Sequence, residues 1–343
     1  MVTTMMILYT DTSLNNPIIS KTAHCILRFD PENVYCIFDE NYKSDYYQAY
    51  STDKIEYSIP IFNTIRALKL ALKECKAHGI NPDFIISMAP VGGKLTAKQI
   101  AVINEIKKLG IRIVNPMHEY LEGALNLRHL NTYKRIIASG KLRNCKRLLF
   151  VGTDFSNGKM TSTVLAYQAL KQANVCADWI ATGQTGLIIR GRGMVIDSIP
   201  IDFVPGNIEY MINESTEPII LIEGQGSIIH PAYSATSFAL FHATMPQYYI
   251  ICHRMNAKEG HMGNIIPHIN DISDLYNNLG RMLGFSTEPL GICLDSSGHT
   301  LDQYIDHKQK VMKETGIICI DPVREDITPM LVPLVGGFLN DNS

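Results

Sequence analysis

The sequence has little excess of charge and no pair of cysteines at metal-binding spacing. Of its 343 residues, 31 are lysine or arginine and 33 are aspartate or glutamate, which gives a formal net charge of −2. A nucleic-acid-binding protein normally carries a basic face, so we expect no nucleic-acid partner. The eight cysteines are scattered, and no two are separated by two residues. This spacing argues against a zinc ribbon or a thioredoxin-like site and favours single thiols in a reducing compartment.

The sequence also lacks a long uninterrupted apolar segment. Residues 224–253 contain no Asp, Glu, Lys or Arg, but Pro231, Pro246 and three histidines interrupt them. A membrane-spanning helix needs about 20 predominantly apolar residues, and the first residues lack the basic start of a secretory signal. We therefore expect a cytoplasmic protein with no membrane partner. Contents of 46% apolar and 19% charged residues are ordinary for a folded chain and exclude disorder.

The length favours two domains, at roughly 150 residues per domain. The first half is predicted to contain strands at 35–38, 84–88 and 111–114. One helix is predicted at 62–78, and a second follows the turn at 90–93 and ends at about residue 109. The second half is predicted to contain strands at 148–151, 177–180, 219–222, 248–252, 291–294 and 317–320, with helices at 159–173, 269–283 and 300–315. Strand, glycine turn, helix and strand in succession predict parallel sheets with right-handed crossovers. The basic stretch 139–147 is predicted to connect the two α/β domains.

The strongest local motif is an apolar strand that runs into a glycine-bounded loop and a helix at 148–161. Glycines let the backbone approach a phosphate, and the N–H groups at a helix start favour an anion. The predicted cofactor-binding residues are Gly152, Thr153, Asp154, Asn157, Gly158, Lys159, Met160 and Thr161. Five residues separate the glycines where the common phosphate loop has four, and Met160 replaces the usual hydroxyl after the lysine. The displaced hydroxyl at Thr161 argues against metal-dependent triphosphate chemistry.

A second apolar strand, at 219–222, ends in a carboxylate and a flexible turn. Ligands of an open parallel sheet bind beyond the carboxyl ends of its strands, so Glu223 should lie near the phosphate loop if the two strands are neighbours. Glu223 can bind a metal, accept a substrate ammonium or act as a base. His230 and Tyr233 add an imidazole and a phenol. Taken alone, His230 is more typical of a satisfied loop histidine.

The segment 181–193 between these motifs is rich in Gly, Thr and Gln, which suits a loop around a ligand. The predicted substrate-binding residues are Thr182, Gln184, Thr185, Arg190, Arg192, Gln225 and Ser227. Arginines suit carboxylates or phosphates, although isolated arginines in a glycine-rich turn are more often solvated. The turn Gly92-Gly93-Lys94 is a weaker anion-site candidate. His253, His261 and His268 are too far apart for a compact metal motif and are predicted to be structural.

Several long motifs, in order, carry a family resemblance. The motifs GTDFSNGKMT, ATGQTG, DSIPIDFVPGNIE and IEGQGSIIHPAYS closely resemble the C-terminal domain of the D-glutamate N-acetyltransferase-like family, long catalogued as a domain of unknown function. The motifs PDFIISMAPVGGKL and NPMHEYLEG resemble the N-terminal Rossmann-like domain of that family. The resemblance implies an α/β protein with a Rossmann-like domain at 1–140. A larger P-loop NTPase-like domain with a mainly parallel sheet follows at 141–343.

The resemblance also implies a reaction, acetyl transfer from acetyl-CoA to the amine of D-glutamate. The partner is then a small amino-acid substrate, acetyl-CoA is the co-substrate, and we expect a homo-oligomer. Amine acetylation needs a base and a stabilised oxyanion. Glu223 or His230 is the expected base, Tyr233 serves the oxyanion or the leaving thiolate, and Lys159 contacts phosphate. Arg190 and Arg192 recognise phosphates or substrate carboxylates.

A second resemblance leaves an alternative open. The loop around Lys159 and the strand end at Glu223 are also similar to dethiobiotin synthetase, an ATP- and Mg²⁺-dependent enzyme that activates carboxylates. There the lysine contacts phosphates, and residues matching Asp154 and Glu223, with Thr161, are expected to hold Mg²⁺. This resemblance implies a ligase or kinase acting on a small carboxylate or amine. Met160 counts modestly against it, and a non-catalytic nucleotide sensor is a third possibility.

Overall fold

The computed structural model describes residues 5–11, 13–16, 19–52, 54–88, 94–129 and 133–336. The chain divides into two compact units, which are treated separately below. The first unit comprises Met1–Asn131 and Leu187–Gly191, and the second comprises Thr132–Gly186 and Arg192–Ser343. The predicted boundary lies between residues 140 and 141. Of the candidate anion turn, Gly92 and Gly93 lie outside the described residues.

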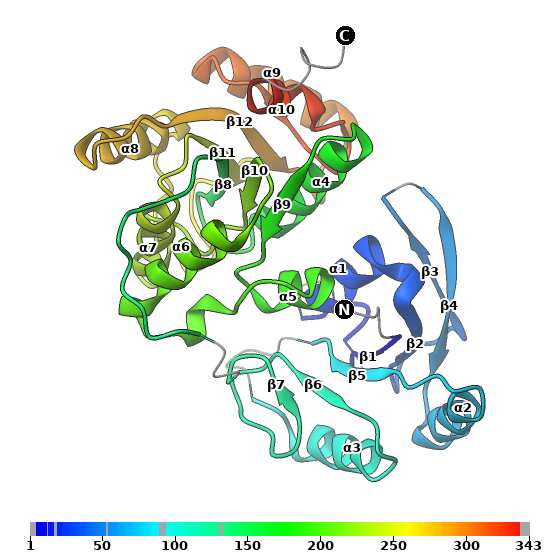
Figure 1. Cartoon of the computed structure of the whole chain (residues 1–343). Helices are drawn as coiled ribbons and strands as arrows, with labels where there is room; N and C mark the ends of the chain where they lie inside the picture. Colours follow the sequence, from blue (N-terminus) through cyan, green and yellow to red (C-terminus); the bar gives the residue numbers. More distant parts are fainter. Residues whose placement is uncertain are drawn as a thin grey trace. The chain divides into compact units, whose positions relative to one another are not determined.

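The first unit is built on a mainly parallel sheet (Figure 1). Its elements are β1 (Met6–Tyr9), α1 (Lys21–Phe29), β2 (Val34–Phe38), β3 (Tyr46–Tyr50), β4 (Glu56–Phe62), α2 (Ile65–Ala77), β5 (Asp83–Ile86), α3 (Ala97–Lys107), β6 (Ile113–Asn115) and β7 (Leu125–Asn126). The strand order is β3-β4-β2-β1-β5-β6-β7, and only β3 and β4 pair antiparallel. All four residues of β1 are buried, as a parallel strand covered on both faces requires. The predicted strand–helix–strand unit is confirmed, since β5 and β6 are parallel neighbours flanking α3 in the chain.

The second unit contains a six-stranded sheet in which every pair is parallel. Its strands are β8 (Lys146–Gly152), β9 (Ala177–Ile180), β10 (Ile219–Ile222), β11 (Tyr248–Arg254), β12 (Glu288–Asp295) and β13 (Cys319–Ile320). Its helices are α4 (Lys159–Gln172), α5 (Gln184–Arg190), whose residues from Leu187 belong to the first unit, α6 (Val204–Glu214), α7 (Ser234–Thr244), α8 (Ile269–Met282), α9 (Leu301–Thr315) and α10 (Thr328–Val335). The strand order is β13-β12-β11-β8-β10-β9, so the chain places β10 and β11 on opposite sides of β8. Open α/β sheets bind ligands at such a point, where successive strands are added on opposite sides of a central strand.

Most of the predicted elements of the second unit are confirmed. The strands β9 and β10 have the predicted bounds, and α4 and α8 each end one residue earlier than predicted. The helices α5, α6, α7 and α10 were not predicted, because glycines, prolines or hydroxyl residues obscure their periodicity. Among the described residues, no helix combines the length and the hydropathy that crossing a membrane would take.

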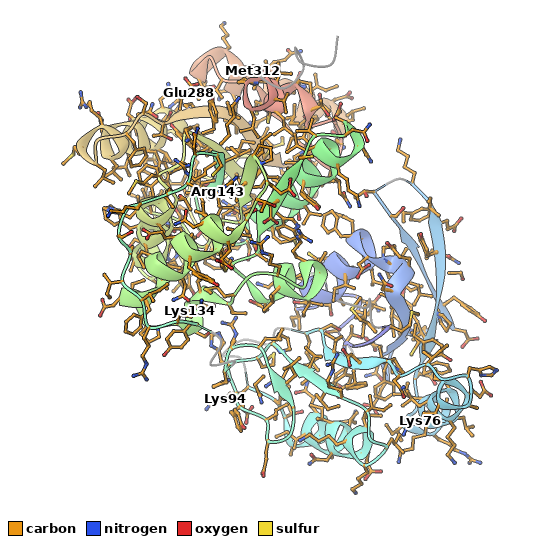
Figure 2. All side chains as sticks on the ribbon, viewed as in Figure 1. Lys76, Lys94, Lys134, Arg143, Glu288 and Met312 are labelled. Carbon is orange, nitrogen blue, oxygen red and sulfur yellow. The ribbon has the colours of Figure 1, made fainter. Side chains whose placement is uncertain are left out.

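The basic stretch predicted as a connection packs along α6 of the second unit. The Glu209 carboxylate accepts hydrogen bonds from the N–H and the hydroxyl of Ser139. It also accepts from the Gly140 N–H at 2.7 Å. The Lys134 ammonium lies 3.4 Å from the centre of the Tyr210 ring. Figure 2 labels Lys134 and Arg143, which lie on the extended segment that runs alongside α6 and bonds to Asn207 and Asn213. These contacts join the segment firmly to the P-loop domain.

Candidate active site

The two predicted strand ends meet at one edge of the sheet. The strands β8 and β10 are parallel neighbours, with Leu149 opposite Ile222. Gly152 ends β8 and Glu223 follows β10, so the phosphate loop and the buried carboxylate leave the sheet side by side. The edge also receives the end of β11, which is the other neighbour of β8. Three strand ends therefore deliver polar groups to one place.

Lys159 lies folded beneath the phosphate loop. It is the first residue of α4, follows Gly158 in the left-handed conformation (φ 82°), and its side chain is only 6% exposed. Its ammonium donates to the carbonyl oxygen of Asp154 at 2.6 Å. A Cβ atom at Gly152 would lie 2.5 Å from this ammonium. The same Cβ atom would lie 2.8 Å from the Asp154 carbonyl oxygen, and because this backbone oxygen cannot swing aside as a lysine side chain can, glycine is required here.

Hydrogen bonds between side chains and backbone fix the shape of the loop. The Thr153 hydroxyl lies 2.9 Å from Nδ1 of His253 and 2.9 Å from the Asn157 amide. With its oxygen turned toward Thr153, that amide also accepts from the Asp154 N–H at 3.1 Å and donates to the Phe155 carbonyl at 3.2 Å. Burial lowers the pKa of His253 to about 4, so this imidazole is neutral at physiological pH. His253 is thus structural, in the way the sequence predicted.

Glu223 is held in a pocket that glycines make possible. The carboxylate is 4% exposed and accepts from the Thr182 N–H at 3.0 Å and the Gly183 N–H at 3.4 Å. A Cβ atom at Gly186 would collide with it. Burial raises the pKa of Glu223 to about 7, although the two N–H groups and the charge of Lys159 oppose this rise. Near neutral pH, both protonation states of Glu223 are accessible.

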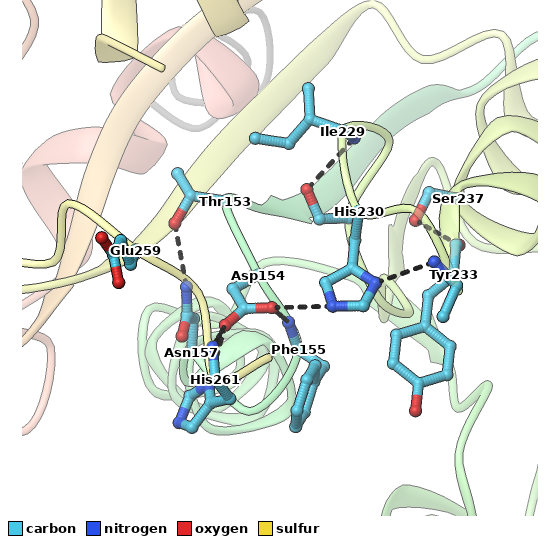
Figure 3. Close-up of polar contacts among 12 residues, drawn as sticks. Thr153, Asp154, Phe155, Asn157, Ile229, His230, Tyr233, Ser237, Glu259 and His261 are labelled. Carbon is cyan, nitrogen blue, oxygen red and sulfur yellow. Dashed lines mark hydrogen bonds and ion pairs between the residues drawn. The ribbon is translucent and has the colours of Figure 1, made fainter. Parts of the chain in front are cut away.

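Asp154 is buried between two histidines (Figure 3). One carboxylate oxygen accepts from the Phe155 N–H at 2.8 Å, and the other accepts from both the backbone N–H and Nδ1 of His261 at 2.7 Å. Burial disfavours the charged form, but the hydrogen bonds from His261 outweigh it and hold the pKa of Asp154 below its usual range. Asp154 is therefore an anion at neutral pH.

This arrangement bears on the Mg²⁺ site that the second resemblance implies. A hard cation needs free oxygen ligands, whereas the oxygens of both Asp154 and Glu223 face N–H donors. Thr161 lies in the first turn of α4, after Met160. Among the described residues, no group of three or more His, Cys, Asp or Glu side chains is placed to hold a metal. In this arrangement Mg²⁺ would share both carboxylates with N–H donors, so the implied Mg²⁺ rests on the resemblance alone.

His230 is completely buried behind Asp154. Its Nδ1 accepts from the Ala232 N–H at 3.1 Å, so the proton of the neutral ring is on Nε2. That Nε2 lies 3.7 Å from Asp154 and has no hydrogen-bond partner within the described ranges. The imidazole stacks on Tyr233, with ring centres 4.8 Å apart, and Tyr233 is 42% exposed. The structure therefore places His230 and Tyr233 beside Asp154, on the phosphate-loop side.

The other predicted substrate-binding residues of the second unit lie at three places. Thr182 and Gln225 support Glu223, since the Thr182 hydroxyl donates to the Glu223 carbonyl at 2.7 Å and Gln225 donates to that hydroxyl at 3.1 Å. Ser227 accepts from the Ile229 N–H at 3.4 Å and shapes the turn. Gln184 and Thr185 begin α5.

Of the two arginines predicted to bind substrate, Arg192 has its partners away from the loop, and Arg190 belongs to the other unit. The Arg192 guanidinium pairs with Asp178 inside β9 and donates to the Met211 carbonyl at 3.3 Å, so it is engaged elsewhere in the second unit. Arg190 ends α5, in the segment that belongs to the first unit.

His261 and Arg254 are the polar residues at this edge that sequence reasoning missed. His261 was predicted to be structural, yet it contacts Asp154 across 107 residues of sequence. Arg254 is the last residue of β11 and donates to Nε2 of His261 at 2.9 Å. No local pattern signals the contact of His261 with Asp154, because it depends on β11 being the neighbour of β8.

Comparisons with known proteins place the chain in context. A family model described as "Domain of unknown function (DUF1611_C) P-loop domain" matches residues 136–331. A protein named D-glutamate N-acetyltransferase from Pseudoalteromonas sp is 31% identical over 270 residues, covering 73% of this chain and 80% of that protein. One of the same name from Tritonibacter scottomollicae is 30% identical, covering 75% and 81%. The crystal structure of a DUF1611 family protein from Anabaena variabilis has the same fold, with a TM-score of 0.83 and 24% identity over 97% of this chain and 99% of that one.

Proposed function

Because the chain belongs to the DUF1611 family, we propose that it is an N-acetyltransferase that moves an acetyl group from acetyl-CoA to the amine of a D-glutamate-like amino acid. One observation carries the proposal beyond the names of its relatives. A buried lysine beneath a glycine-bounded loop lies next to a buried carboxylate whose pKa is about 7. The lysine, Lys159, suits a donor that carries phosphate groups, and the carboxylate, Glu223, suits proton transfer at neutral pH.

The loop would hold the phosphates of coenzyme A. The ammonium of Lys159 and the N–H groups at the start of α4 are directed to the strand edge where an anion is favoured. The ammonium rests on the Asp154 carbonyl oxygen, and phosphate oxygens would replace that partner. Gly152, Thr153, Asn157 and Gly158 shape the loop around this ion, and Met160 and Thr161 begin the helix behind it.

Glu223 would move the proton of the reaction. The neutral amine attacks the thioester carbonyl carbon, a C–N bond forms, and the C–S bond breaks as coenzyme A leaves. Glu223 accepts the proton that the nitrogen loses and returns it to the thiolate sulfur. A pKa near 7 allows both transfers at neutral pH. The Tyr233 hydroxyl, on an exposed side chain stacked on His230, would donate to the tetrahedral oxyanion.

The test is release of free thiol from acetyl-CoA in the presence of D-glutamate. We expect thiol release that depends on the amino acid, with N-acetylglutamate formed in equal amount. Formation of ADP from ATP and Mg²⁺ without thiol release would replace the proposal with the ligase or kinase alternative. Tight binding of coenzyme A or ATP with no turnover against an amino-acid panel would identify a sensor.

A further inference from the structure

Beside the phosphate loop, three polar groups form a chain that the mechanism above does not use. Arg254 donates to Nε2 of His261 at 2.9 Å, and Nδ1 of His261 lies 2.7 Å from the buried Asp154 carboxylate. The ring of Phe155 packs on His261, with centres 4.8 Å apart. All four residues lie at the ends of β8 and β11 or in the loops that follow these strands, within the second unit.

The partners of His261 fix its tautomer. An arginine can only donate, so Nε2 of His261 must accept, and the ring proton is on Nδ1, facing Asp154. A carboxylate that orients an imidazole and leaves its outer nitrogen with a lone pair is the arrangement of a general base. Asp154 would also stabilise the imidazolium once Nε2 took up a proton.

The loop that carries His261 is built to hold it in place. Glu259 and Ile265 form an antiparallel bridge, and the Gly260 N–H donates to the Asn264 carbonyl at 2.7 Å. Arg254 donates a second hydrogen bond, to the Glu259 carbonyl at 3.0 Å, so it is fixed to the same loop. This second hydrogen bond keeps the guanidinium on the loop that carries the imidazole.

We propose that Arg254 and His261 form the subsite for the α-carboxylate and the α-ammonium of the amino-acid substrate, with His261 as the base that removes the ammonium proton. This rests on the proposed function. In an α-amino acid the nitrogen and the nearer carboxylate oxygen are about 3 Å apart by covalent geometry. The guanidinium and Nε2 are separated by 2.9 Å, so one α-amino acid can reach both. Its carboxylate would draw Arg254 away from Nε2 and free the lone pair.

The two proton carriers then have separate tasks. A substrate ammonium has one proton more than the attacking amine, and His261 Nε2 accepts it as the N–H bond breaks. The His261 side chain is 34% exposed, so the imidazolium can release this proton to water, whereas Glu223 is 4% exposed and keeps its proton for the thiolate. Asp154 is a positioning residue, because it acts through the imidazole.

Binding of two probes tests the carboxylate half of the subsite. D-glutamate has an α-carboxylate, and 4-aminobutyrate has the same amine and distal carboxylate without it. By calorimetry on the full chain, Arg254→Met should weaken D-glutamate binding about 10-fold or more and leave 4-aminobutyrate unchanged. Arg281→Met, on the exposed face of α8, is the control and should change neither. Equal affinity of the Arg254 variant and the wild type for D-glutamate would overturn the proposal.

Kinetics test the base. His261→Asn should lower kcat by about 100-fold with little change in KM for D-glutamate. The loss should shrink as the pH approaches the pKa of the substrate ammonium, where free amine is already present. His268→Asn, which replaces the exposed N-cap of α8, is the control. A uniform loss at every pH would reject the base. Wild-type protein that binds coenzyme A but no amino acid would reject the subsite, whereas absence of any thiol release would reject the proposed function itself.

Discussion

Replacing Glu223 by glutamine should stabilise the protein at alkaline pH and remove its activity. The pKa of this carboxyl group is raised from 4.5 to about 7 by burial. The folded protein therefore binds the proton more tightly than the unfolded chain does. Below pH 4.5 both states hold the proton, and between pH 4.5 and 7 only the folded state does. Stability is thus fully present at low pH and is lost as the pH rises through about 7.

The size of this effect follows from the difference in pKa. At about 1.4 kcal/mol per pKa unit, ionised Glu223 costs the fold about 3 kcal/mol at pH 8.5. A glutamine can still accept from the Thr182 and Gly183 N–H groups but cannot ionise. Glu223→Gln should therefore match the wild type at pH 4.5 and exceed it by up to about 3 kcal/mol at pH 8.5. Its rate of thiol release should fall by about 100-fold or more, because the proton carrier is gone.

Urea denaturation at a series of pH values measures the first effect, and the thiol assay measures the second. Glu288→Gln is the matched control, since Glu288 is exposed at the start of β12 (Figure 2). The control should not change the pH dependence. A Glu223→Gln variant less stable than the wild type at pH 8.5 would refute the argument, because it would mean that the carboxylate is a net contributor to the fold when charged.

Three further substitutions probe other parts of the site. Lys159→Ala should weaken coenzyme A binding by about 10-fold or more, measured by calorimetry, with a nearly unchanged far-ultraviolet spectrum; unchanged affinity would count against the loop assignment. Gly186→Ala should overlap the buried carboxylate and lower the free energy of unfolding by about 1–3 kcal/mol, whereas Gly336→Ala, at the end of α10, should not, because a Cβ atom there would make only ordinary van der Waals contacts. Arg192→Met should remove the charged partner of the buried Asp178 carboxylate and leave it the Ser215 hydroxyl, which donates at 2.8 Å, so the melting temperature should fall while the affinity for coenzyme A stays the same; a loss of affinity alone would return Arg192 to the binding site.

The sequence predicts the sheet of the second unit well and its polar edge only in part. Strands such as β8 and β10 are continuous apolar runs, which a parallel sheet covered on both faces requires. The phosphate loop was predictable because its residues, from Gly152 to Lys159, are consecutive in the sequence. Contacts across the sheet were not predictable in this way. The pairing of Asp154 with His261 depends on the order of the strands in the sheet. The ion pair of Arg192 forms because the chain after α5 comes back beside β9, where Asp178 lies. Residue type alone suggested a ligand for Arg192, and only the position of Asp178 shows where its charge is satisfied.

The bracing of the phosphate loop by Thr153, Asn157 and His253 has a consequence for affinity. A flexible loop loses conformational entropy when a ligand orders it, and that loss is subtracted from the binding free energy. Here the order is already present before any anion arrives. Preorganisation of this kind lets each new contact with phosphate count almost fully toward binding, and it leaves the backbone of the loop nearly unmoved between the free and the occupied protein.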